Sequence, residues 1–273
     1  MGAFDFDDPT TGSVQALIRE LETVAIAAGE EILAVRAAGA TVTVKSDHTP
    51  VTQADQRAEA LILDFLTTSY PGIPVVAEEL AEAGRCPSHA GDMFFLVDAL
   101  DGTGDFIAGR NEFTVNIALI RGHTPVAGVV YAPALGKMWS GVTGHAQVAE
   151  VTADGEIMGQ RDIHTRQRPK TPVALVSVTH KEPETDAWLE SMPEHETASV
   201  GSSLKFCLLA EGRADVYPRL VCLKQWDIAA GDAVLRAAGG MTLTLDGIPL
   251  RYGVEDANFG CARFVGWGQA PNA

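Results

Sequence analysis

Carboxylates recur directly after short apolar runs, where a buried strand would deliver them to the edge of a sheet. The pair EE at 78–79 follows the run 73–77, and DALDGT at 98–103 follows the run 93–97. Two carboxylates three residues apart at a strand end cannot both be buried without a cation, because burying an uncompensated carboxylate is costly. Clustered carboxylate oxygens are the donors that Mg²⁺ prefers. These segments therefore predict a divalent-metal site.

Two further acidic positions stand at the start of predicted helices. Asp227 opens an apolar-periodic helix that ends at the glycine pair 239–240, and Asp55 closes the segment VTQAD. Each has a local alternative. Asp227 alone is typical of a helix N-cap, and Thr52 with Asp55 resembles a capping box with Asp in place of Glu. By itself, the pair at 78–79 is typical of a solvated surface and the Asp-Gly at 101–102 of a plain turn.

The hydrophobic pattern of the first half predicts the elements that position these groups. Apolar residues at three-and-four spacing predict a helix over about 13–35 and a second one from near Thr52 through Leu66. The runs 73–77 and 93–97 are interpreted as buried strands, and 102–103 as the start of a helix. From 113 to 151, apolar strands with short connectors favour an antiparallel sheet.

The second half alternates strands and helices. Beyond a polar stretch at 152–172, we expect strands over 173–178, 215–218 and 241–245, with helices over 203–211 and 227–238. This alternation is typical of an α/β fold. We place a boundary in the polar stretch, between an α+β metal-binding half at 1–160 and a tightly coupled α/β substrate-recognition half at 161–273.

Composition narrows the function classes. The chain carries 20 Lys+Arg against 36 Asp+Glu, a formal charge of −16, which argues against a nucleic-acid polymer as partner. No apolar window reaches the roughly 18–20 residues of a transmembrane span, and the acidic N-terminus lacks signal-peptide features. Four scattered cysteines without a CxxC pair are typical of reduced thiols. We expect a cytoplasmic protein, with peripheral contact at the inner face of a membrane left open.

Taken together and in this order, VTQAD, AEE, DALDGT and WDIAAGDAV resemble the inositol monophosphatase superfamily of Mg²⁺-dependent, Li⁺-sensitive phosphatases, over about residues 45–240. The motifs DPxDGT and WDxAA define that family. The stretches EFTVNIALI at 112–120, GSSLKFC at 201–207 and ADVYPR at 214–219 resemble the bacterial 3′(2′),5′-bisphosphate nucleotidases. The resemblance implies the layered αβαβα sugar-phosphatase fold and removal of the 3′-phosphate of adenosine 3′,5′-bisphosphate or its sulfated precursor.

The resemblance also implies a metal cluster of two or three Mg²⁺ ions and a water nucleophile. The implied metal ligands are Glu78, Asp98, the carbonyl of Leu100, Asp101 and Asp227. Glu79 would lie next to these ligands without binding the metal itself. The ions would clamp the attacking and leaving oxygens of an in-line displacement. Asp55, Thr103 and Glu78 would be the catalytic residues, with Thr103 Oγ drawing the proton of the water and Asp55 orienting that hydroxyl.

Substrate contacts are implied in both halves. They are Glu78, Asp101, Gly102, Thr103, His180, Ser202, Lys205, Arg219 and Asp227. The N–H groups at 102–103 would hold the phosphate to be cleaved, at the positive end of a helix dipole. From the second half, Ser202, Lys205 and Arg219 would reach the second phosphate and the ribose. His180 would lie near the adenosine. Three of these residues have an alternative interpretation. Lys205 could be a solvated helix residue, Arg219 a member of a surface ion pair, and His180 an ordinary loop histidine.

This sequence departs from the family pattern beside the metal motif. Ala99 replaces the usual proline, which removes no ligand, and Gly104-Asp105 stands where bacterial relatives commonly have Lys-Glu. The second change removes a cation beside the phosphate, and Arg110 would supply part of that charge. These changes bear on substrate preference more than on metal chemistry.

Two other functions are compatible with the same residues. One is an inositol-1-phosphate or sugar-phosphate phosphatase with the same metal site. The other is a non-catalytic sensor of metal and phosphate, although a sensor need not retain the pair Thr103 and Asp55. The resemblance allows a monomer or a homodimer, and the sequence does not choose between them.

Overall fold

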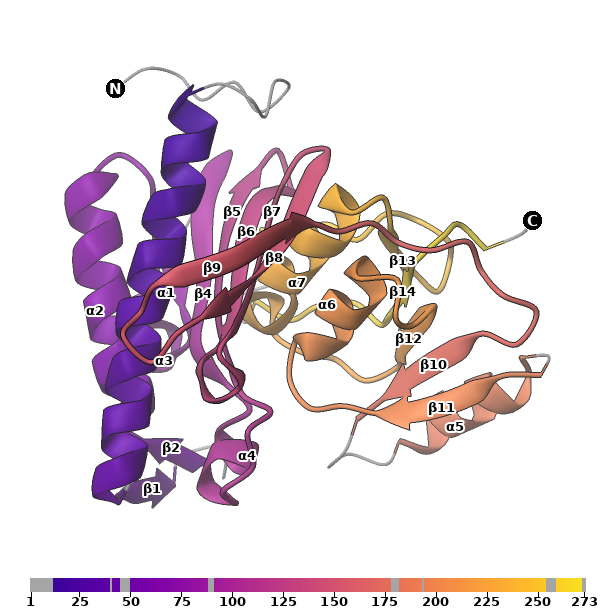
Figure 1. Cartoon of the computed structure of the whole chain (residues 1–273), viewed down its shortest axis with the longest axis horizontal. Coiled ribbons are helices and arrows are strands. Elements are labelled where there is room, and N and C mark those ends of the chain that lie inside the picture. The colour runs from indigo at the N-terminus through magenta and orange to yellow at the C-terminus, as the bar shows by residue number, and fades with distance from the viewer. Residues whose placement is uncertain are drawn as a thin grey trace.

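Helices and sheets alternate in layers across the molecule (Figure 1). The computed structural model describes residues 12–39, 41–44, 50–87, 91–177, 182–192, 194–253 and 259–271. From left to right in the figure, two long helices cover a large sheet, two further helices separate it from a smaller sheet, and one helix lies outside. These helices are α1 (Gly12–Ala38), α2 (Gln53–Ser69), α6 (Leu204–Ala210), α7 (Gln225–Ala237) and α5 (Pro183–Glu190). The αβαβα layering expected from the sequence is confirmed.

The larger sheet has seven strands in the order β3-β4-β5-β6-β7-β8-β9. Only β3 and β4 run parallel, and the remaining neighbours are antiparallel, as the short connectors predicted. The strands are β3 (Val75–Ala77), β4 (Met93–Asp101), β5 (Thr114–Arg121), β6 (Thr124–Ala132), β7 (Lys137–Val142), β8 (His145–Val151) and β9 (Ile157–Asp162). Strand β9 was not anticipated, because it lies in the polar stretch and is nearly all exposed, so that its pairing with β8 alone defines it.

The smaller sheet has five strands in the order β11-β10-β12-β14-β13, and it is mixed. Strand β10 runs parallel to β11 and β12, whereas β14 runs antiparallel to β12 and β13. The strands are β10 (Val173–Val176), β11 (Glu196–Ser199), β12 (Val216–Arg219), β13 (Met241–Thr244) and β14 (Phe264–Trp267). Helix α5 and strands β11 and β14 are additions to the predicted elements.

Short elements complete the described part of the chain. They are β1 (Val42–Val44), β2 (Pro50–Thr52), α3 (Glu78–Glu82), α4 (Thr103–Ile107) and the 3₁₀ helix η1 (Pro133–Leu135). Helix α2 begins after Thr52, close to the predicted start, and α4 begins after Gly102 as expected. No helix among the described residues is both long enough and apolar enough to cross a membrane.

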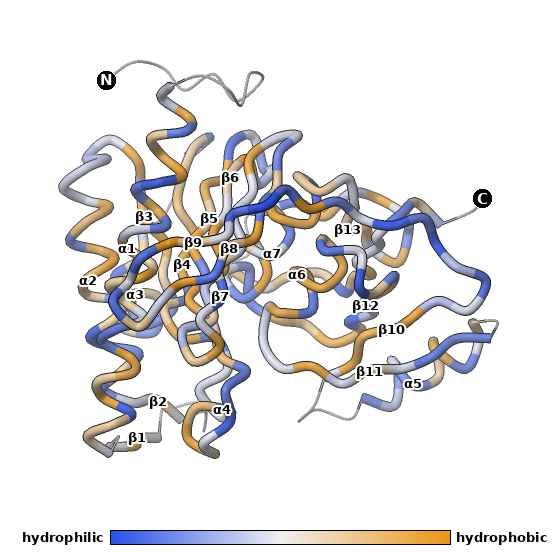
Figure 2. The backbone as a smooth tube through the Cα atoms, in the orientation of Figure 1, coloured by the Kyte–Doolittle hydropathy of each residue, from blue (hydrophilic) through white to orange (hydrophobic). Residues whose placement is uncertain are grey.

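Apolar faces hold the layers together, and Figure 2 shows hydrophobic segments concentrated where the layers meet. One core lies between α1, α2 and the large sheet, and includes Leu21, Ile32 and Ile62 with no exposed area. A second core joins the large sheet to α6, α7 and the small sheet, so both halves of the chain contribute to it. Fully burying each such large side chain contributes about 1.5–3 kcal/mol.

Two glycines let α7 approach the large sheet closely. A Cβ atom added at Gly128 in β6 would lie 2.6 Å from Ala233 Cβ, and one at Gly141 in β7 would lie 2.8 Å from Val234 Cα. Both distances are shorter than packed carbon atoms adopt. The missing side chains therefore fix the height of α7 above the sheet, and with it the position of Asp227 in the first turn of α7.

We expect Gly128→Ala to destabilise the protein by about 1–3 kcal/mol, because the added methyl group must push α7 away from β6. Urea unfolding measures this free energy. Gly72→Ala is the matched control, since a Cβ there meets nothing within 4 Å. Equal unfolding free energies for the two variants would contradict the close-packing argument.

A buried carboxylate lies between α1 and the sheet. Glu22 is 3% exposed, and its Oε1 accepts hydrogen bonds from Ser140 Oγ at 2.7 Å and Gln147 Nε2 at 3.3 Å. Burial raises the pKa of Glu22 above the ordinary glutamate value near 4.5, more than these hydrogen bonds lower it. The folded state therefore binds this proton more tightly than the unfolded state.

Stability contributed by protonated Glu22 is fully present below the unfolded pKa and is lost as pH rises through the folded pKa. We expect Glu22→Gln, which keeps the accepting oxygen, to be more stable than the wild type at neutral pH and to lose this advantage on acidification. Thermal unfolding from about pH 4 to about pH 8 measures the difference. The exposed Glu150→Gln is the control, and parallel pH profiles for the wild type and Glu22→Gln would refute the explanation.

Candidate metal centre and active site

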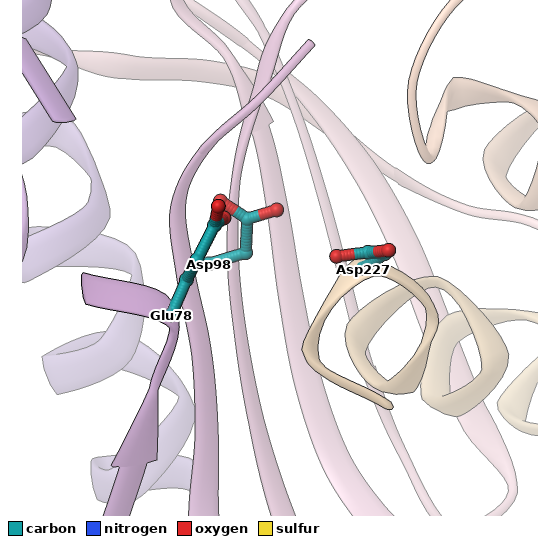
Figure 3. A group of neighbouring side chains, drawn as sticks. All are labelled: Glu78, Asp98 and Asp227. Atoms are coloured by element: carbon teal, nitrogen blue, oxygen red, sulfur yellow. The ribbon is translucent and has the colours of Figure 1, made fainter. Parts of the chain in front are cut away.

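Three carboxylates from separate elements converge between the large sheet and α7. Oxygens of Glu78, Asp98 and Asp227 all lie within 4.8 Å of one another, and Figure 3 shows the side chains pointing toward a common space. Glu78 begins α3, Asp98 lies in β4 and Asp227 lies in the first turn of α7. The sequence predicted all three as ligands of one metal cluster.

The parallel pair β3 and β4 explains why the first two meet. In the register of this pair Ala77 lies beside Val97, so the residues that follow, Glu78 and Asp98, leave the same edge of the sheet together. Asp98 is 3% exposed, and its Oδ1 accepts the backbone N–H of Leu100 at 3.0 Å. This local hydrogen bond lies within β4, where the pairing with β5 shifts between Asp98 and Asp101.

Asp101 lies beside this group but has other partners. In a regular strand, residues three apart point to opposite faces. Here the pairing of β4 with β5 shifts between Asp98 and Asp101, and Asp101 is close enough to raise the pKa of Asp98. Its Oδ2 accepts Ser202 Oγ at 2.6 Å and the N–H of Ser203 at 2.7 Å. One oxygen of Asp101 is therefore bonded to the second half of the chain.

The cluster is electrostatically unfavourable without a cation. Burial raises the pKa of Asp98 well above its usual value, and the charges of Glu78, Asp101 and Asp227 raise it further. Burial and the charges of Asp101 and Glu78 raise the pKa of Asp227, while the hydrogen bond from the Lys224 backbone and the charge of Arg219 lower it. Hard oxygen donors held together in this way fit a divalent cation such as Mg²⁺, which would replace their repulsion with attraction. The donor set therefore fits the metal that the resemblance implies.

Asp55 serves two neighbours with its two oxygens. Oδ2 accepts the N–H and the hydroxyl of Thr52, both at 2.7 Å, which forms the capping box of α2. Oδ1 accepts Thr103 Oγ at 2.9 Å from the other side of the site. Asp55 thus forms the predicted helix cap and also the hydrogen bond to Thr103 that the functional interpretation requires.

The turn at Gly102 needs a glycine for two reasons. Its φ is 93°, in the left-handed region, and an added Cβ would lie 3.0 Å from the carbonyl oxygen of Glu112. The turn leads directly into α4 at Thr103. Thr103 Oγ also lies 3.2 Å from the carbonyl of Leu100, another implied ligand.

Glu59 is a residue of this region that sequence reasoning missed. It is 3% exposed in α2, and its two oxygens accept the N–H groups of Glu79 and Leu80 at 2.7 and 2.8 Å. It thereby holds the first turn of α3, which presents Glu78. Burial and the adjacent acidic charges raise the pKa of Glu59 to about 7. The available signal was its position one helical turn after Asp55 on the same face of α2.

The cations expected to meet a second phosphate are buried in the second half. Lys205 is 4% exposed, and burial lowers its pKa to about 8 although Asp101 opposes this. Arg219 is 7% exposed and forms an ion pair with Glu182, while its Nε has no hydrogen-bond partner among the described residues. The alternative of a solvated lysine is therefore wrong, and the ion pair considered for Arg219 is present but buried rather than at the surface. His180 lies outside the residues that the structure describes.

Arg110 does not provide a free cation beside the cleavage turn. Its Nε donates to Asp105, which is 5% exposed, so the arginine neutralises the acid that stands in place of the family's Lys-Glu pair. The loop before Glu112 is fixed by Arg36 of α1, which donates to Gly109 O at 2.6 Å and lies over the Phe113 ring. The expectation that Arg110 supplies phosphate-binding charge is corrected accordingly.

Fold and site are those of a metal-dependent phosphatase, and comparison with known proteins agrees. A model of the inositol monophosphatase family matches residues 13–263. The chain belongs to the inositol monophosphatase family.

Several relatives within this family are similar over most of their length. The 3′(2′),5′-bisphosphate nucleotidase CysQ of Shigella flexneri is 43% identical over 211 residues, which cover 77% of this chain and 82% of the relative. The protein of the same name from Escherichia coli K12 is 42% identical over 211 residues, which again cover 77% of this chain and 82% of the relative. The crystal structure of CysQ from Bacteroides thetaiotaomicron aligns with a TM-score of 0.77 at 32% identity, covering 93% of this chain and 97% of that one.

We expect Asp98→Asn to have opposite effects with and without metal. Without it, the variant should unfold at a higher temperature than the wild type, because one buried charge is removed from the cluster. With Mg²⁺ at a hundredfold excess over its dissociation constant, the wild type should gain about 2.7 kcal/mol and the variant much less.

Thermal unfolding with Mg²⁺ and with a chelator measures both effects. The exposed Asp154→Asn is the control for a lost surface charge. The same Mg²⁺-induced rise in Tm for wild type and Asp98→Asn would exclude Asp98 as a ligand.

Proposed function

We propose that this protein is a Mg²⁺-dependent 3′(2′),5′-bisphosphate nucleotidase, which hydrolyses the 3′-phosphate of adenosine 3′,5′-bisphosphate to give AMP and phosphate. The sulfated precursor is a second substrate of the same chemistry. The observation that carries the proposal is the convergence of Glu78, Asp98 and Asp227. The relatives named 3′(2′),5′-bisphosphate nucleotidase, which match over most of their length, support the substrate class.

The carboxylates of this site are suited to two or three Mg²⁺ ions. In our proposal the ligands are those given by the family motifs: Glu78, Asp98, Leu100 O, Asp101 and Asp227. Bound ions would supply charge to the phosphoryl oxygens and lower the pKa of the attacking water. We assign Oδ1 of Asp101 to the metal, because Oδ2 already accepts hydrogen bonds from Ser202 and Ser203.

Thr103 is positioned to accept a hydrogen bond from the attacking water. Its single hydroxyl proton is directed to Asp55 Oδ1 at 2.9 Å, which leaves the lone pairs of Oγ to accept a hydrogen bond from water. Asp55 is in turn held by the capping box of α2. The pair therefore orients the water without forming a covalent intermediate, and this arrangement favours an enzyme over a sensor.

The 3′-phosphate that is hydrolysed would lie against the start of α4. In our proposal the N–H groups of Gly102 and Thr103 contact its oxygens, and the left-handed turn at Gly102 brings the backbone close enough to do so. Glu78, Asp101 and Asp227 would contact the phosphate through bound metal ions.

Recognition of the second phosphate is assigned to the buried cations of the second half. The Nε of Arg219, which has no hydrogen-bond partner in the described part of the chain, is a donor for a phosphate oxygen. Lys205 supplies a second buried positive charge near it, since Arg219 is among the charges that lower the pKa of Lys205. Ser202 completes the proposed contacts to phosphate and ribose, and His180 remains the proposed neighbour of the adenosine.

Phosphate release from adenosine 3′,5′-bisphosphate and from inositol 1-phosphate, measured in parallel with Mg²⁺, tests this proposal. We expect preference for the nucleotide and inhibition by Li⁺. Asp98→Asn should reduce the rate by more than the roughly 10–100-fold typical of losing a contact behind a metal ligand, whereas the exposed Asp154→Asn should not.

Other outcomes would distinguish the alternatives. Preference for inositol 1-phosphate would keep the metal site and reject the roles of Ser202, Lys205 and Arg219. Binding of Mg²⁺ without phosphate release from either compound would contradict the proposed nucleotidase activity.

A further inference from the structure

The segment 200–205 crosses from the second half of the chain to the first and bonds to a proposed metal ligand. Ser202 Oγ and the Ser203 N–H both donate to Oδ2 of Asp101, at 2.6 and 2.7 Å. The preceding N–H, of Gly201, donates to Glu112 Oε2 at 2.7 Å. Three consecutive residues thus attach this segment to the end of β4 and the loop before β5.

Lys205 stabilises the conformation of this segment through hydrogen bonds to two backbone carbonyl groups. Its ammonium group donates to Ser202 O at 2.7 Å and to Val200 O at 3.1 Å. Ser202 has a φ of 53°, a left-handed conformation that residues other than glycine rarely adopt. The two hydrogen bonds fix the carbonyl groups around that residue, and the Tyr217 ring lies 5.2 Å from the ammonium nitrogen. The conformation that directs Ser202 Oγ to Asp101 therefore depends on Lys205.

Strand β5 fixes the other side of the segment. Ser203 Oγ donates to Asn116 Oδ1 at 2.7 Å and also lies 2.9 Å from Thr114 Oγ1, where all three side chains are buried. The serines are thereby held between the lysine of α6 and a strand of the metal-binding half. These buried hydrogen bonds restrict the movement of the segment.

We propose that Lys205 is a positioning residue for metal binding, acting through Ser202 and Ser203 on the carboxylate of Asp101. The inference rests on the proposed function, since it concerns a ligand of that same site, and it adds to the substrate contact assigned there. Hydrogen bonds to one oxygen fix the rotation of a ligating carboxylate and so present its other oxygen.

The charge of Lys205 and its positioning role predict opposite effects on metal affinity when the lysine is replaced. As a positive charge near Asp101, Lys205 repels a metal ion, so removing the charge alone would tighten metal binding. As a positioning residue it favours the binding geometry, so its removal weakens metal binding. The sign of the change therefore separates the two roles.

The experiment is a titration with Mn²⁺, followed by the electron paramagnetic resonance signal of the free ion, in the absence of any substrate. The variants are Lys205→Met, Ser202→Ala and the double variant of the full chain. We expect Lys205→Met to weaken Mn²⁺ binding about tenfold. Because both residues act through one contact, the double variant should bind no more weakly than the weaker single variant. The exposed Lys170→Met is the matched control and should bind as the wild type does.

Unchanged or tighter Mn²⁺ binding by Lys205→Met would overturn the proposal, as would losses that simply add in the double variant. If Lys205→Met does not fold, as judged by circular dichroism, Ser203→Ala replaces it. That variant keeps the backbone donor to Asp101 but loses the bonds to Asn116 and Thr114. We expect it to weaken Mn²⁺ binding several-fold less than the lysine change, about two- to fivefold, and wild-type affinity would refute the network.

Failure of the proposed function gives a separate result. If the wild type binds Mn²⁺ but releases no phosphate from adenosine 3′,5′-bisphosphate, the nucleotidase proposal fails. The metal titrations use no substrate, so they still decide the role of Lys205.

Discussion

Mutual repulsion of clustered carboxylates, of which Asp98 is buried, is the constraint on which this structure depends. Glu78, Asp98 and Asp227 come from α3, β4 and α7, and oxygens of all three lie within 4.8 Å of one another. Nothing local brings them together, so the fold must hold them against their charge. It does so with the parallel register of β3 and β4, and with the close approach of α7 over Gly128 and Gly141. A bound cation would turn this cost into binding energy, which couples metal affinity to folding.

Local stabilising roles and functional roles coincide in the same side chains. Asp55 caps α2 with one oxygen and holds Thr103 with the other. Asp227 accepts the N–H of Lys224 at 3.0 Å at the start of α7 and contributes to the metal group. A helix terminus fixes a short side chain in one orientation, which is also what a ligand or a positioning group requires. A cap and the position proposed for each side chain in the site are therefore compatible here.

Positive charge near the site is held in fixed contacts. Lys205 is bonded to two carbonyl groups, Arg219 is paired with Glu182, and Arg110 is paired with Asp105. In a chain of formal charge −16, long-range attraction cannot bring an anionic substrate to the site. Recognition must then come from the geometry of a few donors at close range, such as the unpartnered Nε of Arg219.

The sequence by itself determined the antiparallel strands of the first half, the α/β alternation of the second and the acidic motifs, because periodicity and residue type are local properties. The layered fold class came from the resemblance of those motifs to a known family. It missed β9, whose polar residues carry no period, and Glu59, whose partners Glu79 and Leu80 lie in another helix. Only the tertiary structure decided how the acidic motifs meet and which cations are already paired. Contacts between distant segments depend on register and packing, which no local pattern encodes.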